Sequence, residues 1–319
     1  MEPDDKALAD SQRQSSAVKA YAKHLLERMP RDFTLYTLYP LLSRQAHHHY
    51  ANIDMSRLLP HTVSIETHTL CNEKCSFCLA AAPTNPRGNL KMPDELFHQI
   101  IDELATVRYS GRVAFFVNNE PFIDKRIFDF VAYAKEKLPN AYLQISSNGR
   151  LIKPKTAQDI FAAGLSGLII NCYRDDGQVH PHIPEVLDSL KPEDRAKVTV
   201  FRRDVGQQIT NRAGSSPNME TITKPMPAFC SFPFHQINVV HDGNVSLCCM
   251  DLLVQEVMGN VKDEGVLGVW FGEKFAEVRR KLLNYDRTCT DICKVCDWRG
   301  FKGLTGALEP LNRAMTHVA

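Results

Sequence analysis

The chain has 319 residues, of which 44% are hydrophobic and 24% are charged. This composition is typical of a globular protein and excludes a disordered or collagen-like one. Lys and Arg number 38 against 37 for Asp and Glu, so the net charge of +1 gives no sign of nucleic-acid binding. No hydrophobic run approaches the roughly 20 residues that cross a bilayer, and the acidic amino terminus does not resemble a signal peptide. We therefore expect a cytoplasmic protein that binds neither nucleic acid nor a membrane.

Ten cysteines are unusual in a chain that is not expected to be secreted. A protein of this length can bury a core large enough to fold without disulfides, so a disulfide framework does not explain them. Nine of the ten fall into two clusters, Cys71 to Cys78 and Cys230 to Cys296, and Cys172 lies between the clusters. The clustering favours metal binding over disulfide formation.

Two regions precede the second cysteine cluster. Residues 1–60 are predicted to form a helical extension, with hydrophobic stripes over 17–29 and 31–42. Residues 61–229 alternate between short hydrophobic stretches and helical ones. The predicted strands are 63–67, 113–117, 142–146, 167–171 and 198–201, and the predicted helices are 93–107, 125–137, 155–163 and 183–190.

Such alternation predicts an α/β fold with a parallel sheet and right-handed crossovers. Five or six units are too few to close an eight-stranded barrel, so we expect a partial (β/α)6 barrel. After residue 218 the alternation ends. Residues 230–300 are predicted to form a small cysteine-rich domain, with a β-hairpin over 236–248 and a helix over 264–283, and 301–319 to form a tail.

The first cluster places Cys71, Cys75 and Cys78 directly after the first predicted strand, in the pattern C-x3-C-x2-C. Three thiolates can hold three irons of a cubane cluster and leave the fourth iron open to another ligand, whereas fully protein-ligated clusters use four cysteines. A zinc site with an additional ligand from elsewhere is the alternative. Zinc loops usually show C-x2-C pairs, so the triplet favours iron.

This triplet, with Phe77 before its last cysteine, resembles the radical S-adenosylmethionine (SAM) superfamily. The resemblance implies a [4Fe-4S] cluster whose open iron chelates the amino and carboxylate groups of SAM. Electron transfer from the reduced cluster then cleaves SAM to methionine and a 5′-deoxyadenosyl radical. It also implies an external one-electron reductant of the flavodoxin or ferredoxin type.

Other positions match secondary features of that family, each at the carboxyl end of a predicted strand. Glu120 lies in Asn-Asn-Glu-Pro, where the family has Gly-Gly-Glu-Pro, and would accept a hydrogen bond from the methionine ammonium group. The two asparagines in place of glycines are a departure from the family. The resemblance implies further contacts with the cofactor from Phe77, Ser146, Asn171 and Arg202.

The second cluster is similar to the twitch domain, a shortened SPASM region. The resemblance implies one auxiliary [4Fe-4S] cluster, and so two clusters in total. Its ligands would be Cys230, Cys248, Cys293 and Cys296. A structural zinc site would use the same four ligands.

Three cysteines remain. Cys172 ends a hydrophobic strand and is expected to be a buried small side chain, and Cys289 is a spare or alternative ligand. Cys249 follows a predicted ligand, so strand alternation turns it to the opposite face, towards the barrel. Its S–H bond is weaker than a typical C–H bond, so it can return hydrogen to a substrate radical and invert that carbon. An inert thiol, or Cys249 itself as the cluster ligand, is the alternative.

The combination resembles the twitch-type enzymes of aminoglycoside biosynthesis. It implies a radical SAM epimerase, an isomerase that inverts a sugar carbon of an aminoglycoside with Cys249 as hydrogen donor. The alternatives are a twitch-type dehydrogenase, a peptide-modifying radical SAM enzyme and a non-catalytic metal-binding module. A polycationic substrate should favour an acidic pocket. The candidate acids are Asp175, Asp176, Asp204, Asp242 and Asp251.

Overall fold

A curved eight-stranded sheet forms the centre of the protein in a computed structural model, which describes residues 29–80, 85–206 and 210–300. The strand order is β5-β4-β3-β2-β1-β6-β7-β8. The first six strands in this order are parallel, and β7 pairs in antiparallel with both β6 and β8. The strands are β1 Thr62–Ile65, β2 Arg112–Ala114, β3 Tyr142–Ser147, β4 Gly167–Tyr173, β5 Val198–Arg203, β6 Gln236–Val239, β7 Asn244–Ser246 and β8 Val257–Asn260.

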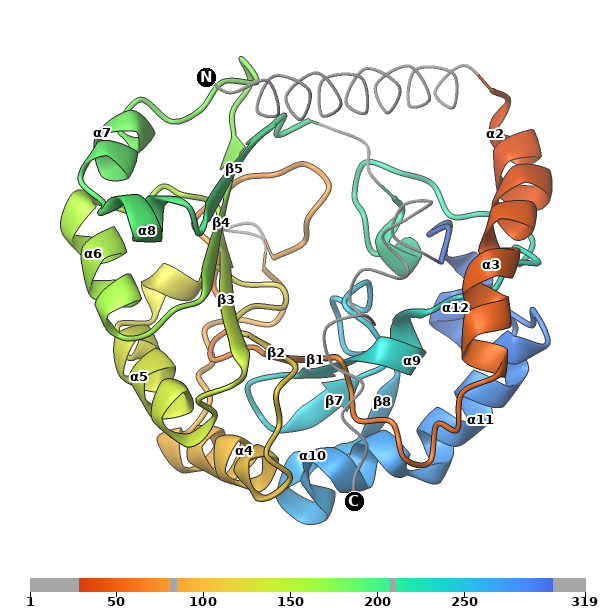
Figure 1. Ribbon diagram of the computed structural model, residues 1–319. Helices are drawn as coiled ribbons and strands as arrows, with labels where there is room; N and C mark the ends of the chain where they lie inside the picture. Colours follow the sequence, from red (N-terminus) through yellow and green to blue (C-terminus); the bar gives the residue numbers. More distant parts are fainter. Residues whose placement is uncertain (1–28, 81–84, 207–209, 301–319) are drawn as a thin grey trace, which may run out of the picture.

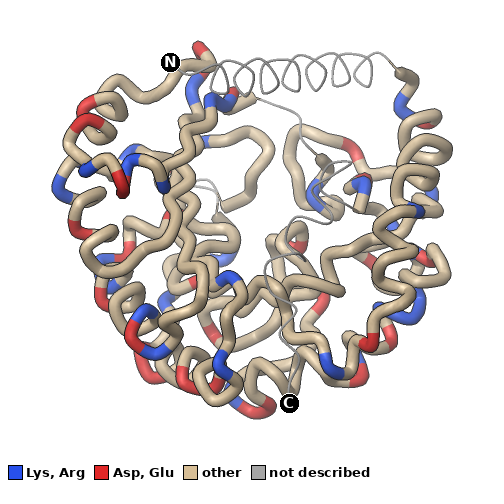
Figure 2. The backbone as a smooth tube through the Cα atoms, in the orientation of Figure 1, with Lys and Arg blue, Asp and Glu red and all other residues tan. Residues whose placement is uncertain are grey.

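Helices follow one another around the outside of this sheet (Figure 1), which confirms the predicted α/β partial barrel. Acidic and basic residues are interspersed over these outer helices (Figure 2). No helix in the described ranges is long and hydrophobic enough to cross a membrane. The barrel helices are α4 Asp94–Thr106, the 3-10 turn η2 Pro121–Ile123, α5 Ile127–Lys137, α6 Pro154–Ala162, α7 Ile183–Asp188 and α8 Pro192–Arg195.

Helix α4 shows why the outer helices bind the sheet. Hydrophobic side chains recur along one face and are buried, while Asp94 and Glu95 at its start favour the positive end of the helix dipole. Phe97 stacks on Phe130 of α5, with ring centroids 4.1 Å apart. Each such buried side chain contributes about 1.5–3 kcal/mol relative to an exposed one. The outer helices are therefore held by burial of one face each.

The helical extension predicted over residues 1–60 is described only from residue 29 onwards. The stripe over 17–29 lies almost entirely outside the described residues, and so does the tail 301–319. Residues 31–42 are helical as predicted, in α2 Arg31–Phe33, the π-helical turn η1 Thr34–Leu38 and α3 Tyr39–Ala51. Helix α3 packs beside α11 Glu273–Leu283.

The predicted hairpin forms, but it is continuous with the barrel sheet. Strand β6 pairs in parallel with β1 and in antiparallel with β7, so it is the sixth barrel strand. All four residues of β6 are buried, as expected for a central parallel strand. The sequence boundary at residue 230 therefore does not separate two independent sheets.

The helix predicted over 264–283 is instead two helices, α10 Val261–Phe271 and α11. Gly272 has an extended backbone that ends α10, and Gly265 has a φ of +72°, which kinks it. At the kink, Glu103 of α4 accepts hydrogen bonds from the Val266 and Leu267 N–H groups at 2.7 and 2.9 Å. Two short helices, α9 Phe232–His235 and α12 Asp291–Val295, complete this region.

We expect Glu103→Ala to lower the free energy of unfolding by about 1–3 kcal/mol, because it leaves two backbone donors at the kink without their acceptor. Urea unfolding of the anaerobically purified protein, followed by circular dichroism, measures the change. Glu136→Ala on the exposed face of α5 is the matched control. Equal stability of the two variants would contradict the capping role.

Candidate active site

Three thiols on the loop after β1 line a cavity of about 240 Å³. The Cys78 N–H donates to the Cys75 carbonyl at 3.1 Å, which turns the loop tightly around the cavity. Asn148 Nδ2 lies 3.8 Å from Cys71 Sγ, and Arg212 Nη1 lies 4.0 Å from Cys78 Sγ. Burial raises the pKa of Cys71 to about 11 and that of Cys75 further. Ionised thiols here therefore need a cationic group to compensate them.

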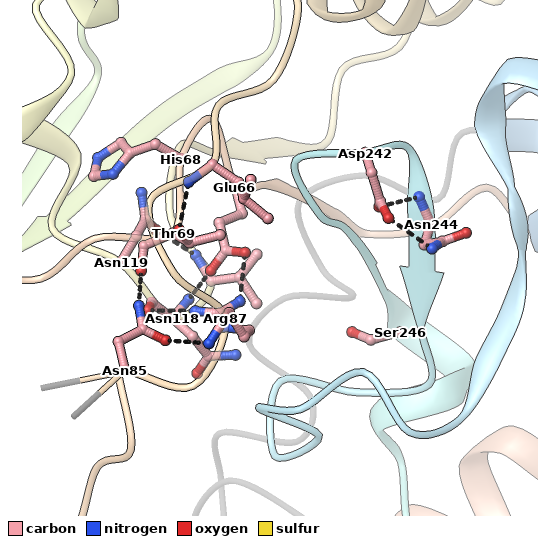
Figure 3. A network of polar contacts seen from close by, with 12 residues as sticks. Glu66, His68, Thr69, Asn85, Arg87, Asn118, Asn119, Asp242, Asn244 and Ser246 are labelled. Carbon is pink, nitrogen blue, oxygen red and sulfur yellow. Dashed lines mark hydrogen bonds and ion pairs between the residues drawn. The ribbon is translucent and has the colours of Figure 1, made fainter.

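A buried ion pair holds the base of this loop (Figure 3). Arg87 Nη1 donates to Glu66 Oε2 at 2.7 Å, and Arg87 Nη2 donates to the Asn118 carbonyl at 3.1 Å. The Asn118 N–H in turn donates to Glu66 Oε1 at 3.1 Å. Asn85 links the same site to Thr69. This network was not predicted from the sequence, where the one signal for it is a glutamate at the end of a hydrophobic predicted strand.

Glu120 connects the loop after β2 to the loop after β3. Its carboxylate accepts from Ser147 Oγ at 2.8 Å, from the Asn148 N–H at 2.7 Å and from the Phe122 N–H at 3.2 Å. It lines the cavity of the three thiols, and burial raises its pKa to about 7. Glu120 therefore orders two loops at the cavity wall, beside the residues predicted to meet a cofactor.

The other predicted cofactor residues divide into two groups. Phe77 lines the first cavity, and Ser146 and Asn171 line both this cavity and a larger one beside it. Arg202 differs from the prediction. It is exposed, and strand alternation turns it away from the cavity face that Phe201 and Arg203 occupy. Arg203 is therefore the β5 arginine at the site.

A second group of four thiols lines a narrow, mostly hydrophobic cavity at the carboxyl-terminal side. Its cysteines are Cys230, Cys248, Cys293 and Cys296. Cys249 does not line it, so the geometry favours Cys248 over Cys249 as the ligand. Cys289 hydrogen-bonds Cys293. In the described part of the chain, no three His, Cys, Asp or Glu side chains meet closely enough to hold a single metal ion.

A larger cavity of about 390 Å³ lies inside the barrel and borders both thiol sites. It shares Ser146, Asn171 and Arg212 with the first cavity and Met250 with the second. Cys249 lines this cavity, but β7 ends at Ser246 and both Cys248 and Cys249 lie in the turn that follows it, so this turn, and not the predicted strand alternation, sets their different positions. Cys172 is buried, as predicted.

The acids expected around this cavity do not line it. Asp176 pairs with Arg174, Asp242 caps the hairpin turn, and Asp251 accepts from backbone N–H groups of the loop before β8. Asp175 and Asp204 are exposed on the loops after β4 and β5. Among the described residues, the lining holds three arginines and no carboxylate.

Two family models match the sequence of this chain. Residues 65–183 match the radical SAM superfamily, and residues 230–297 match the SPASM iron-sulfur cluster-binding domain. The chain is a radical SAM protein. It is an enzyme of that superfamily that uses SAM, one [4Fe-4S] cluster in the barrel and an auxiliary cluster in the SPASM region.

Individual relatives cover most of the chain. The S-adenosyl-L-methionine-dependent 2-deoxy-scyllo-inosamine dehydrogenase of Niallia circulans is 26% identical over 235 residues, which cover 74% of this chain and 92% of the relative. The AdoMet-dependent heme synthase of Methanosarcina barkeri is 26% identical over 52% of this chain and 46% of its own length. The crystal structure of BtrN in complex with AdoMet and 2-DOIA has a TM-score of 0.65 at 26% identity, over 75% of this chain and 93% of BtrN.

The residues present fit these cofactors. The first three thiols could hold three irons of a cubane cluster and would leave the fourth without a protein ligand, and their cavity shares lining residues with the larger one. Around the second cavity, Arg287 is fully buried and donates to the carbonyls of Ala228, Phe229 and Trp298. The nearby thiols raise its pKa against the effect of burial. A buried cation that faces four thiols suits an anionic thiolate-ligated cluster.

Removing Arg87 should destabilise the radical SAM protein strongly, because Glu66 would remain buried without its partner. We expect Arg87→Met to lower the free energy of unfolding by about 3–5 kcal/mol, and Glu66→Gln in the same chain to restore part of the loss. Urea unfolding measures both. Lys155→Met, which breaks an exposed pair with Asp159, should change little. Equal effects of Arg87→Met and Lys155→Met would refute this account.

We expect Arg287→Gln to lower the reduction potential of the auxiliary cluster. A nearby positive charge stabilises the reduced, more negative cluster, and glutamine removes that charge. Redox titration followed by electron paramagnetic resonance measures the potential, and Arg287→Lys, which keeps the charge, should shift it less. The barrel cluster is the internal reference. An unchanged auxiliary potential in Arg287→Gln would show that this charge does not act on the cluster.

Proposed function

We propose that this radical SAM enzyme is an epimerase that inverts one sugar carbon of an aminoglycoside, of the type that converts neomycin C to neomycin B at C-5‴. The observation that carries the proposal is the position of Cys249. Its thiol lines the large cavity but not the first one, while Ser146 and Asn171 line both. A substrate in the large cavity could thus contact a cofactor in the first cavity at one end and the Cys249 thiol at the other.

The cofactors supply one reaction: cleavage of SAM gives a 5′-deoxyadenosyl radical that removes a hydrogen atom from the substrate. The residues predicted to hold SAM are Phe77, Glu120, Ser146 and Asn171, which line the first cavity. Glu120 would accept from the methionine ammonium group in addition to its present hydrogen bonds. Arg203 replaces Arg202 as the β5 arginine at the site.

Cys249 completes the proposed reaction by hydrogen-atom transfer. Its S–H bond breaks, and a C–H bond forms on the substrate carbon, from the face opposite to the one that lost hydrogen. The carbon is thereby inverted, and a thiyl radical remains on Cys249. One electron from an external reductant of the flavodoxin or ferredoxin type, together with one proton, restores the thiol. Cys248, which precedes it, lines the auxiliary site.

A dehydrogenase is the second candidate, and the comparisons favour it. The Niallia circulans relative is named as a dehydrogenase of 2-deoxy-scyllo-inosamine, a hydroxylated amine. Under this function, the substrate would lose two hydrogens and the auxiliary site would accept an electron. Cys249 would then have no role in the reaction. The mass of the product distinguishes the two functions, because an epimer has the mass of its substrate.

We expect Cys249→Ala to abolish inversion of neomycin C while deoxyadenosine still forms, because hydrogen abstraction does not need this thiol. In D2O, the wild-type enzyme should place one deuterium at the inverted carbon, since the thiol proton exchanges with solvent. Mass spectrometry and NMR of the product, with deoxyadenosine measured by chromatography, provide the readouts.

Cys172→Ala is the matched control, because Cys172 is a buried thiol that lines none of the cavities described above. It should give the deuterated epimer as the wild type does. A Cys249→Ala enzyme that still inverts the carbon would remove the epimerase mechanism. A product two mass units lighter than the substrate would establish the dehydrogenase instead.

A further inference from the structure

The large cavity has an unusual charge for a site that receives an amino sugar. Arg112, Arg203 and Arg212 line it, and no carboxylate among the described residues does. The hydrogen-bond partners of these arginines are neutral oxygens and one thiol, not acids. These arginines are half-buried, and cations removed from part of their water without acidic partners favour a ligand that brings acceptor oxygens of its own.

Arg112 marks the floor of the cavity. It begins β2, and its register partner on β1, Thr62, also pairs with Gln236 of β6, so these residues form one layer at the amino ends of the parallel strands. Arg112 Nε and Nη2 donate to Thr62 Oγ1 at 3.1 and 2.8 Å, and Nη1 donates to Gln144 Oε1 at 3.3 Å. Two of its five N–H bonds are thus left for a ligand.

The rest of the floor also offers donors. Gln236 Nε2 donates to Asn238 Oδ1, and Asn238 Nδ2 is buried without an acceptor among the described residues. The side-chain oxygen of Gln144 accepts from Arg112, so its amide nitrogen is the group that can donate to a ligand. The guanidinium of Arg112 and the amides of Gln144 and Gln236 therefore line the same end of the cavity, whereas Asn238 lies behind them and does not line it.

We infer that Arg112 is a substrate-positioning residue that donates to a neutral oxygen, a hydroxyl or a ring oxygen, of the sugar presented to Cys249. Protonated amines of the substrate are then kept away from the floor by charge repulsion and remain at the hydrated mouth. There the exposed Asp175 and Asp204 follow β4 and β5. The inference rests on the proposed function, because it assigns an orientation to that substrate.

The direction in which one substitution changes the affinity for neomycin C tests this inference. In the cluster-loaded enzyme with SAM, Arg112→Met should weaken the binding of neomycin C by about tenfold to a hundredfold, because a charge-assisted hydrogen bond is lost. Were an amine beside Arg112, the same substitution would relieve repulsion and tighten binding. Anaerobic isothermal titration calorimetry measures the dissociation constant. Arg112→Lys, which keeps the charge, should lie between the wild type and Arg112→Met.

Arg202→Met is the matched control, because this arginine is exposed on the other face of β5. It should bind neomycin C as the wild type does. Thermal unfolding of each variant establishes that it is folded before binding is compared. We also expect Arg112→Met to form more deoxyadenosine per molecule of product, since a poorly held sugar wastes SAM cleavage.

A substrate analogue that lacks one hydroxyl of the reacting sugar gives the second comparison. If the missing hydroxyl is the one that meets Arg112, the wild type should bind the analogue more weakly than it binds neomycin C. The Arg112→Met variant should bind the analogue and neomycin C equally well. The inference would be overturned if Arg112→Met bound neomycin C more tightly than the wild type. It would also be overturned if the variant had the wild-type affinity and formed the wild-type amount of deoxyadenosine per molecule of product. An oxidised product together with the expected binding pattern would remove the epimerase proposal and leave the role of Arg112 intact.

Discussion

The buried ion pair between Glu66 and Arg87 is the constraint on which the active site depends. Glu66 follows β1, and Arg87 lies 21 residues further on, beyond the three thiols, so the pair closes the loop that carries them. The two side chains also bind the backbone of Asn118: Glu66 accepts from its N–H group, and Arg87 donates to its carbonyl oxygen. Because both charges are desolvated, any arrangement that separates them is costly, and one loop geometry is selected.

Hydrogen bonds extend this constraint across the sheet. Glu120, two residues after Asn118, binds Ser147 and the Asn148 backbone, and the Asn148 side chain reaches Cys71 Sγ. The loops after β1, β2 and β3 thus form one connected polar unit around the first cavity. Such a unit holds the three loops in a fixed relation to one another, which favours binding of a ligand between them.

The strand–helix alternation was sufficient to predict the barrel, and the cysteine spacings indicated two groups of thiols, each of which lines a cavity. Cys249 was expected at the large cavity for a reason that does not hold, because it lies in the turn after β7 and not in a strand. Side chains that act over long sequence separations were not predictable, because no local pattern pairs Glu66 with Arg87 or places Arg287 against the second cavity. Arg202 was chosen because the predicted strand ended at residue 201, whereas β5 continues to Arg203, and within a strand neighbouring residues point to opposite faces. The SPASM match begins at residue 230, the predicted boundary, but the pairing of β6 with β1 was not predictable, because a hairpin turn does not report which outer strand the hairpin joins.

The buried arginines separate structural from functional positions by what surrounds them. Arg87 has its carboxylate, and Arg279 is enclosed by carbonyls and by Trp270 and lines none of the described cavities. Arg287 faces four thiols, whereas Arg112, Arg203 and Arg212 line the large cavity without an acidic partner in the described residues. Arg279 shows that carbonyls and an aromatic ring can hold a buried cation, so a missing carboxylate does not by itself mark a functional position. What sets Arg287 and the three arginines of the large cavity apart is that they line cavities, where the charge or the oxygens of a ligand can meet the guanidinium.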